Sequence, residues 1–245
     1  MRTLGLVLAL LLVSAAGFAA TTYTMDIYEG DNVIAAPGVP FNPVPYDWDP
    51  GESGVFQNLN YEDQLEARLK RWDPTFGYIT YPFDEEFNIL LGEGYNLGEE
   101  IVGVPGDGDI VGSISFVGVD DGVPDGSGTM TDMWISLPGA AEDPQQNNGG
   151  VHLIGYPFNH DLDVGVGGKN VKFTDGTQML TWEQAVAANW VEPVFVAWDS
   201  SINSGVNISY DIPPGDDTYL YPGKGYWVTT KVDNLAMVIL AVPEL

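Results

Sequence analysis

Short apolar stretches separated by Gly, Pro, Asn and Asp follow one another along most of the chain. Short apolar runs between turn-forming residues are typical of β-strands. A helix signal occurs at Thr181-Trp182-Glu183-Gln184, where the spacing of a capping box predicts a short helix that reaches Ala188. The pattern therefore predicts an all-β chain with little helix.

The same short segments recur, in the same order, in the two halves of the chain. The matched segments are residues 33–37 with 153–157, 72–73 with 198–199, 79–81 with 208–210, 92–95 with 223–226, and 101–105 with 239–243. Their offset grows from 120 to 138 residues, as loop insertions in the second copy would produce. A repeat of this kind predicts two duplicated β-rich modules, either sandwich-like or barrel-like.

Each copy shows the same succession of parts. An apolar strand that ends in Pro is followed by a hairpin, then by a Gly-x-Gly-Tyr turn and by a last apolar strand. We therefore divide the chain into a leader at 1–19, a first module at 20–105, a connecting segment at 106–150 and a second module at 151–245. The connecting segment contains predicted strands at 110–119 and 129–137.

The first residues have the pattern of a secretory signal peptide. Met1-Arg2 supplies a positive start, residues 4–13 are apolar, and small residues lead to a cleavage site after Ala19. The apolar run is shorter than the ~20 residues that span a bilayer, and no other stretch reaches that length. The pattern predicts a secreted protein without a transmembrane segment, located outside the cell or on its surface.

Three motifs carry a resemblance to a known group of proteins. They are Trp72-Asp73-Pro74, residues 92–95, and Pro222-Gly223-Lys224-Gly225-Tyr226-Trp227. With them the chain resembles the duplicated Gly-Tyr-Trp β-modules of secreted bacterial surface proteins, which are mostly uncharacterised and often associated with S-layers. The first copy departs from this pattern, with Leu91 in place of Pro and Asn96 in place of Trp. The resemblance implies an extracytoplasmic β-module and carries over no catalytic residue.

Composition excludes several functions. The chain has 35 acidic residues against 8 Lys and Arg, a net charge of −27, so it cannot form the basic surface that nucleic acids require. The absence of Cys excludes thiolate zinc sites and Cys nucleophiles. Apolar residues make up 44% of the chain, which is sufficient for a packed core.

One acidic segment has part of the pattern of a calcium-binding loop. Asp121, Asp125, Gly126 and Asp132 fill positions 1, 5, 6 and 12 of such a loop, whereas Val123 offers no side-chain oxygen at position 3. Asp121, Asp125 and Asp132 are therefore candidate ligands of Ca²⁺. The alternative is an Asp- and Gly-rich turn between strands.

Aromatic residues provide the second candidate site. Trp72, Trp198, Tyr226 and Trp227 could stack on sugar rings, whose C–H faces pack against aromatic rings, while Asp and Asn bind the hydroxyls. The alternative is that these residues recur because both copies need the same core packing.

Three functions are compatible with the sequence. The first is a structural or adhesive cell-surface protein, associated with itself or with other surface components. The second is a carbohydrate-binding module, and the third is a secreted hydrolase that uses two carboxylates. No Gly-x-Ser-x-Gly elbow is present, and we do not expect an enzyme. A subunit of an extracellular array should expose strand edges or an apolar patch, for which residues 235–242 are a candidate.

Overall fold

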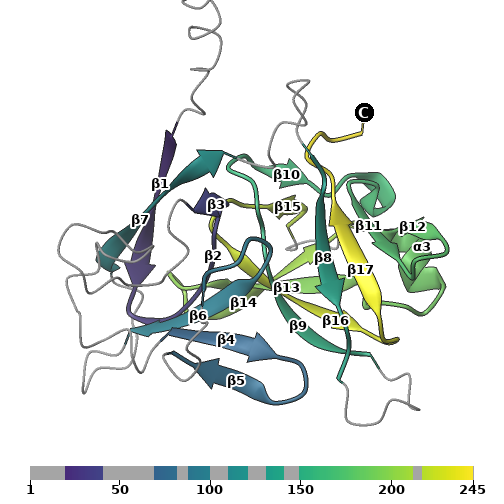
Figure 1. Cartoon of the computed structure of the whole chain (residues 1–245), viewed down its shortest axis with the longest axis horizontal. Coiled ribbons are helices and arrows are strands. Elements are labelled where there is room, and N and C mark those ends of the chain that lie inside the picture. Colours follow the sequence, from purple (N-terminus) through teal and green to yellow (C-terminus); the bar gives the residue numbers. More distant parts are fainter. Residues whose placement is uncertain are drawn as a thin grey trace, which may run out of the picture.

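The computed structural model describes residues 20–40, 69–81, 88–99, 110–120, 131–140, 149–211 and 217–244. Within these residues the chain forms five antiparallel sheets, one short α-helix and one turn of 3₁₀-helix (Figure 1). The predicted all-β class with little helix is therefore confirmed. The predicted signal peptide at 1–19 lies outside the described residues.

The first module is a sandwich of two sheets. Its strands are β1 (Ala20–Tyr28), β2 (Gly30–Ala35), β3 (Gly38–Pro40), β4 (Leu69–Asp73), β5 (Gly77–Thr80), β6 (Gly94–Glu99) and β7 (Ile110–Asp120). One sheet has the order β2-β6-β4-β5 and the other has the order β1-β7-β3. Apolar side chains from both sheets meet between them, among them Ile34, Leu69 and Leu97 against Ile114 and Phe116.

The second module has a corresponding set of strands and a larger core. Its elements are β8 (Met133–Leu137), β9 (Gly150–Gly155), β10 (Leu162–Asp163), η1 (Val166–Gly168), β11 (Val171–Thr174), β12 (Met179–Thr181), α3 (Trp182–Ala187), β13 (Val194–Asp199), β14 (Ser204–Ser209), β15 (Tyr219–Leu220), β16 (Gly225–Thr230) and β17 (Leu235–Ile239). Its sheets are β9-β16-β13-β14 and β8-β17-β11-β12, with a separate β10-β15 ribbon.

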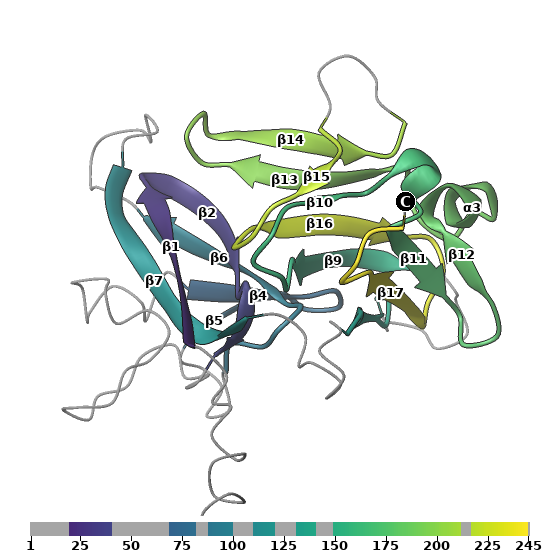
Figure 2. The same ribbon diagram turned by 90° about the horizontal axis from the view of Figure 1, so that it is seen from above.

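The strand order agrees between the two modules. The order β2-β6-β4-β5 corresponds to β9-β16-β13-β14, and β1-β7-β3 corresponds to β8-β17-β11. The register also agrees, since Ala35 is paired with Gly94 in the first module and Gly155 with Gly225 in the second. Equivalent positions can therefore be compared directly between the modules. Figures 1 and 2 show the purple-to-teal strands of the first module beside the green-to-yellow strands of the second.

Two strands that we had placed in a connecting segment belong to these sheets. β7 pairs with β1 and β3, and β8 pairs with β17. The last strand of the chain runs over Leu235–Ile239, slightly earlier than the predicted 239–243, and residues 101–105 lie outside the described residues. β17 pairs with β11 on one side and with β8 on the other, and its side chains, such as that of Met237, are buried in the core. The expectation that residues 235–242 form an exposed apolar patch is therefore wrong for this strand.

The predicted capping box begins helix α3. The backbone N–H of Gln184 donates to the Thr181 hydroxyl over 3.4 Å, and the Gln184 side chain accepts from the Thr181 N–H over 3.0 Å. The helix covers the core with Trp182, which is fully buried and stacks on Phe195 at 3.8 Å between ring centres. The helix prediction is confirmed.

The two modules dock through reciprocal backbone hydrogen bonds. The N–H of Ala35, at the end of β2, donates to the carbonyl of Gly223 over 2.9 Å. The N–H of Gly155, at the equivalent end of β9, donates to the carbonyl of Gly92 over 2.8 Å. Each Gly-x-Gly turn therefore binds the strand end of the other module.

Glycine makes this close approach possible. The Leu153 side chain packs onto Gly94, and Val33 packs onto Gly225. The first residue of β6 and the first residue of β16 therefore each contact the other module. A Cβ atom added to Gly155 would lie 2.6 Å from the Cβ of Ala35 and would clash with the Glu93 carbonyl oxygen. The backbones of the two modules thus meet without intervening side chains.

The substitution Gly155→Ala should weaken the docking of the modules. We expect a loss of about 1–3 kcal/mol in the free energy of unfolding, because backbone atoms of the facing turn must move to admit the methyl group. Urea denaturation measures this change. Gly98→Ala is the matched control, since its Cβ would meet nothing closer than 3.8 Å. Equal stability of the two variants would contradict the proposed role of the contact.

Candidate functional site

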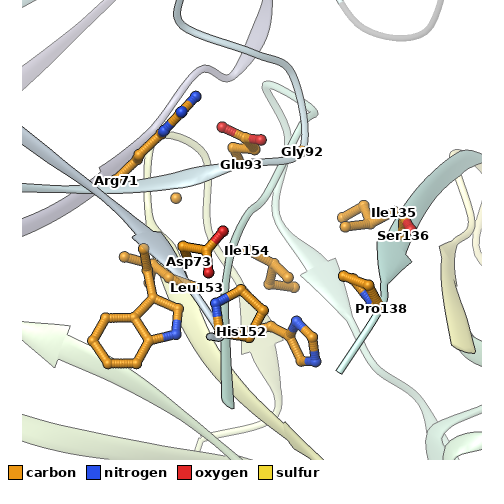
Figure 3. A pocket seen from close by; sticks show the side chains of 13 residues that line it. Arg71, Asp73, Gly92, Glu93, Ile135, Ser136, Pro138, His152, Leu153 and Ile154 are labelled. Carbon is orange, nitrogen blue, oxygen red and sulfur yellow. The ribbon is translucent and has the colours of Figure 1, made fainter. Parts of the chain in front are cut away.

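A cleft of about 370 Å³ lies where the two modules meet (Figure 3). The first module contributes the end of β4 and the turn before β6, and the second contributes β8 and β9. The lining residues are Arg71, Trp72, Asp73, Pro74, Gly92, Glu93, Gly94, Ile135, Ser136, Pro138, His152, Leu153 and Ile154. Ligand sites are often found at such interfaces, at volumes from ~300 Å³ upward.

Two carboxylates face this cleft, and local hydrogen bonds hold both (Figure 3). The Asp73 carboxylate accepts from the backbone N–H groups of Thr75 and Phe76 over 2.8 and 2.9 Å, which closes the β4–β5 turn. Oε2 of Glu93 lies 3.0 Å from the Tyr95 hydroxyl. Burial raises the pKa of Tyr95 far above its ordinary value, so its hydroxyl stays protonated and can donate. Both carboxylates are thus held in fixed positions.

His152 forms the buried end of the cleft. Its Nε2 lies 3.3 Å from the Thr230 hydroxyl, and the side chain is only 5% exposed. Burial lowers the pKa of His152 to about 4, although the nearby Asp233 carboxylate acts in the opposite direction. The imidazole is therefore neutral at pH 7. Asn32 occupies the equivalent position in the first module, where its amide bonds the backbone of Tyr28.

Three aromatic rings form a cluster next to the cleft, and we call Trp72, Tyr78 and Trp227 the aromatic cluster. The Trp72 ring makes T-shaped contacts with Tyr78 and Trp227, with 5.1 Å between ring centres in both pairs. Its Nε1 donates to the carbonyl of Val151 in the second module over 2.6 Å. Tyr78 is 45% exposed. Trp72 therefore belongs to the cleft, to the aromatic cluster and to the contact between modules.

Two of the four candidate sugar-binding residues, Trp198 and Tyr226, lie outside the aromatic cluster. Tyr226 is fully buried, and its hydroxyl accepts from the Tyr221 N–H over 2.6 Å, as Tyr95 accepts from Leu90 in the first module. Tyr226 therefore has a core role, and its ring offers no surface to a ligand. Trp198, the equivalent of Trp72, is half-buried, and no aromatic contact joins it to the cluster within the described residues.

The candidate calcium ligands are only partly described. Asp121 and Asp125 lie outside the described residues, and Asp132 is exposed just before β8. The Asp132 carboxylate accepts from the backbone N–H of Ala241 over 3.0 Å. No group of three potential metal ligands occurs in the described part of the chain. The calcium site stays a prediction from the sequence.

Sequence reasoning missed most of the polar residues in the cleft. Asp73 and Glu93 were visible only as parts of recurring turns, and Arg71, Ser136 and His152 were not singled out as one set. The one available signal was that the motifs around Trp72 and Gly92 recur together. Their convergence depends on contacts between modules, which a single sequence does not reveal.

Comparison with known proteins gave no match: no protein-family model, curated protein or solved structure is significantly similar to the chain. The resemblance to secreted Gly-Tyr-Trp modules therefore stays a prediction from its motifs. Among the described residues, no helix has the length and apolar character needed to cross a membrane.

Trp72 and Trp198 provide a matched pair for testing the contact between modules. Trp72→Phe removes the hydrogen bond to Val151, whereas the Trp198 Nε1 has no acceptor within the described residues. We expect Trp72→Phe to lower the free energy of unfolding by at least about 1 kcal/mol more than Trp198→Phe. Urea denaturation of both variants measures the difference. An equal loss would show that the Trp72 hydrogen bond contributes nothing.

His152 should make the stability of the protein depend on pH. The unfolded chain binds a proton at this residue near pH 6.5 and the folded chain only near pH 4, so the free energy of unfolding falls as the pH drops through this window. The full effect is about 3 kcal/mol. His152→Asn, which copies the equivalent Asn32, should flatten the dependence. Urea denaturation between pH 7 and about pH 4.5 measures the free energy of unfolding of the wild type and of His152→Asn. If this free energy falls equally with pH in both proteins, His152 is not the source of the pH dependence.

Proposed function

We propose that this protein is a secreted adhesive protein of the cell surface, which binds its partner at the cleft between its modules. Secretion is supported by the signal-peptide pattern at 1–19, and the net charge of −27 suits a solvated, exposed protein. The reciprocal backbone bonds fix the relative placement of the modules. A site built from both modules is therefore held in one geometry, which favours binding.

The observation that carries the proposal is the position of Trp72. It lines the cleft, contacts both other rings of the aromatic cluster, and donates to the second module through Nε1. Partly exposed Trp and Tyr side chains that are fixed in place are the residues that contribute most to binding interfaces. The fold thus holds a rigid aromatic residue at the edge of a concave site.

Exposed rings extend this surface along the β4–β5 hairpin. Phe76, at the tip, is 83% exposed, and Tyr78 follows on the next strand. Large exposed apolar side chains next to a cleft are typical of contact surfaces. In the equivalent hairpin of the second module, Gly205 stands opposite Trp198, where Tyr78 stands opposite Trp72 in the first. The cross-strand aromatic pair of the β4–β5 hairpin therefore has no counterpart in the equivalent hairpin of the second module.

We favour adhesion over a structural subunit and over a hydrolase. For a structural subunit we expected unpaired strand edges or an apolar patch, and the candidate patch at 235–242 is not formed by β17, which is central and buried. For a hydrolase the cleft offers Asp73 and Glu93, but Asp73 closes a turn and Glu93 is bonded to Tyr95. These bonds hold both carboxylates in place as hydrogen-bond acceptors.

Binding to cell envelopes tests the proposal. The secreted protein is mixed with washed envelopes from the organism that encodes it, and the pelleted fraction is measured. We expect the wild type to pellet and the double variant Phe76→Ser/Tyr78→Ser to bind about tenfold more weakly, because exposed aromatic contacts are lost.

A matched double variant controls for the loss of exposed apolar surface. Val166→Ser/Ile202→Ser removes two side chains that are 91% and 65% exposed, and Ile202 lies in the equivalent hairpin of the second module. This variant should pellet like the wild type. A wild type that stays in solution, or equal losses in both double variants, would overturn the proposed function.

A further inference from the structure

The chemistry of the cleft indicates the kind of partner that it binds. Its polar lining combines the guanidinium of Arg71, the carboxylates of Asp73 and Glu93, and the Ser136 hydroxyl. Such a set offers both donors and acceptors at several points of one concave surface. It suits a ligand that carries many hydroxyl groups, because each hydroxyl both donates and accepts.

The aromatic cluster adds a surface for the apolar faces of such a ligand. Trp72 lines the cleft, and its ring is in edge contact with Tyr78, which is 45% exposed. A sugar ring presents hydroxyls at its rim and C–H groups on its faces, so it can hydrogen-bond in the cleft and pack on an adjacent aromatic ring.

Charge decides which sugars fit. In the cleft the Arg71 guanidinium stands against two carboxylates, Asp73 and Glu93, while His152 is neutral at pH 7. A second cation, the Lys70 ammonium, lies 5.8 Å from the centre of the Tyr78 ring. The chain as a whole carries a net charge of −27. A polyanionic chain approaching this protein is repelled by the summed field and meets no compensating basic patch in the cleft.

We propose that the cleft between the modules, together with the aromatic cluster, binds an uncharged saccharide chain. This inference rests on the proposed adhesive function and names its ligand class. Hydroxyls of one or two sugar units bind Asp73, Glu93 and Ser136, and a neighbouring unit packs on Tyr78. The rigid docking of the modules keeps both parts of the site in register.

Oligosaccharide titrations test this proposal. The secreted protein is titrated with neutral hexasaccharides of glucose, xylose and mannose, and with an oligogalacturonate of equal length, by isothermal calorimetry. We expect at least one neutral hexasaccharide to bind, with an affinity that changes little between low and high salt. The acidic oligomer should bind at least tenfold more weakly.

Two serine substitutions separate binding in the cleft from binding elsewhere. Ser136→Phe places a ring in the cleft from an exposed position of β8, and we expect it to lower the affinity at least tenfold. Ser204→Phe makes the same change at an exposed position of β14, outside the cleft, and should bind like the wild type. Comparable unfolding curves for both variants show that neither effect is a loss of folding.

Several outcomes would overturn the inference. They are tighter binding of the acidic oligomer, no binding of any neutral hexasaccharide, or equal affinities of Ser136→Phe and the wild type. The envelope assay then distinguishes the two proposals. If the protein binds envelopes but none of the neutral hexasaccharides, only the ligand class is rejected. If it binds neither envelopes nor hexasaccharides, the adhesive function is rejected as well.

Discussion

The relative placement of the two modules depends on the reciprocal backbone contact between two glycine turns and two strand ends. Ala35 donates to Gly223 and Gly155 donates to Gly92, so each module satisfies backbone groups of the other. The close approach is possible only because small residues stand at the contact, as at Gly94 and Gly155. The cleft, the Trp72 bond to Val151 and the buried His152 all lie around this contact.

Equivalent positions in the two modules show what the shared scaffold holds constant and what it allows to vary. The turn tyrosines Tyr95 and Tyr226 both accept a backbone N–H from the residue five positions earlier. Between the turn glycines, by contrast, Glu93 stands in one module and Lys224 in the other. The polar lining of the cleft therefore differs from the equivalent positions of the second module at Glu93, whereas the turn tyrosines serve the packing of both modules.

Local signals in the sequence predicted the elements well, because hairpins, turns and caps depend on neighbouring residues. The hairpins around Trp72 and Trp198, the glycine turns and the Thr181 capping box all occur where the pattern places them. The site was harder to predict, because its members meet only when β4 of one module approaches β8 and β9 of the other. The buried position of β17 was missed for the same reason, since strand order is a non-local property.

The order of strand pairing also sets when the chain can fold. In each module the first strand pairs with the last, β1 with β7 and β8 with β17, so the sandwich closes only after its whole length is available. Sheets with such distant pairings form slowly, because the loop-closure entropy is lost before the contacts form. The signal-peptide pattern at 1–19 predicts that this chain is exported, and slow closure would then keep the chain unfolded while it passes through the membrane.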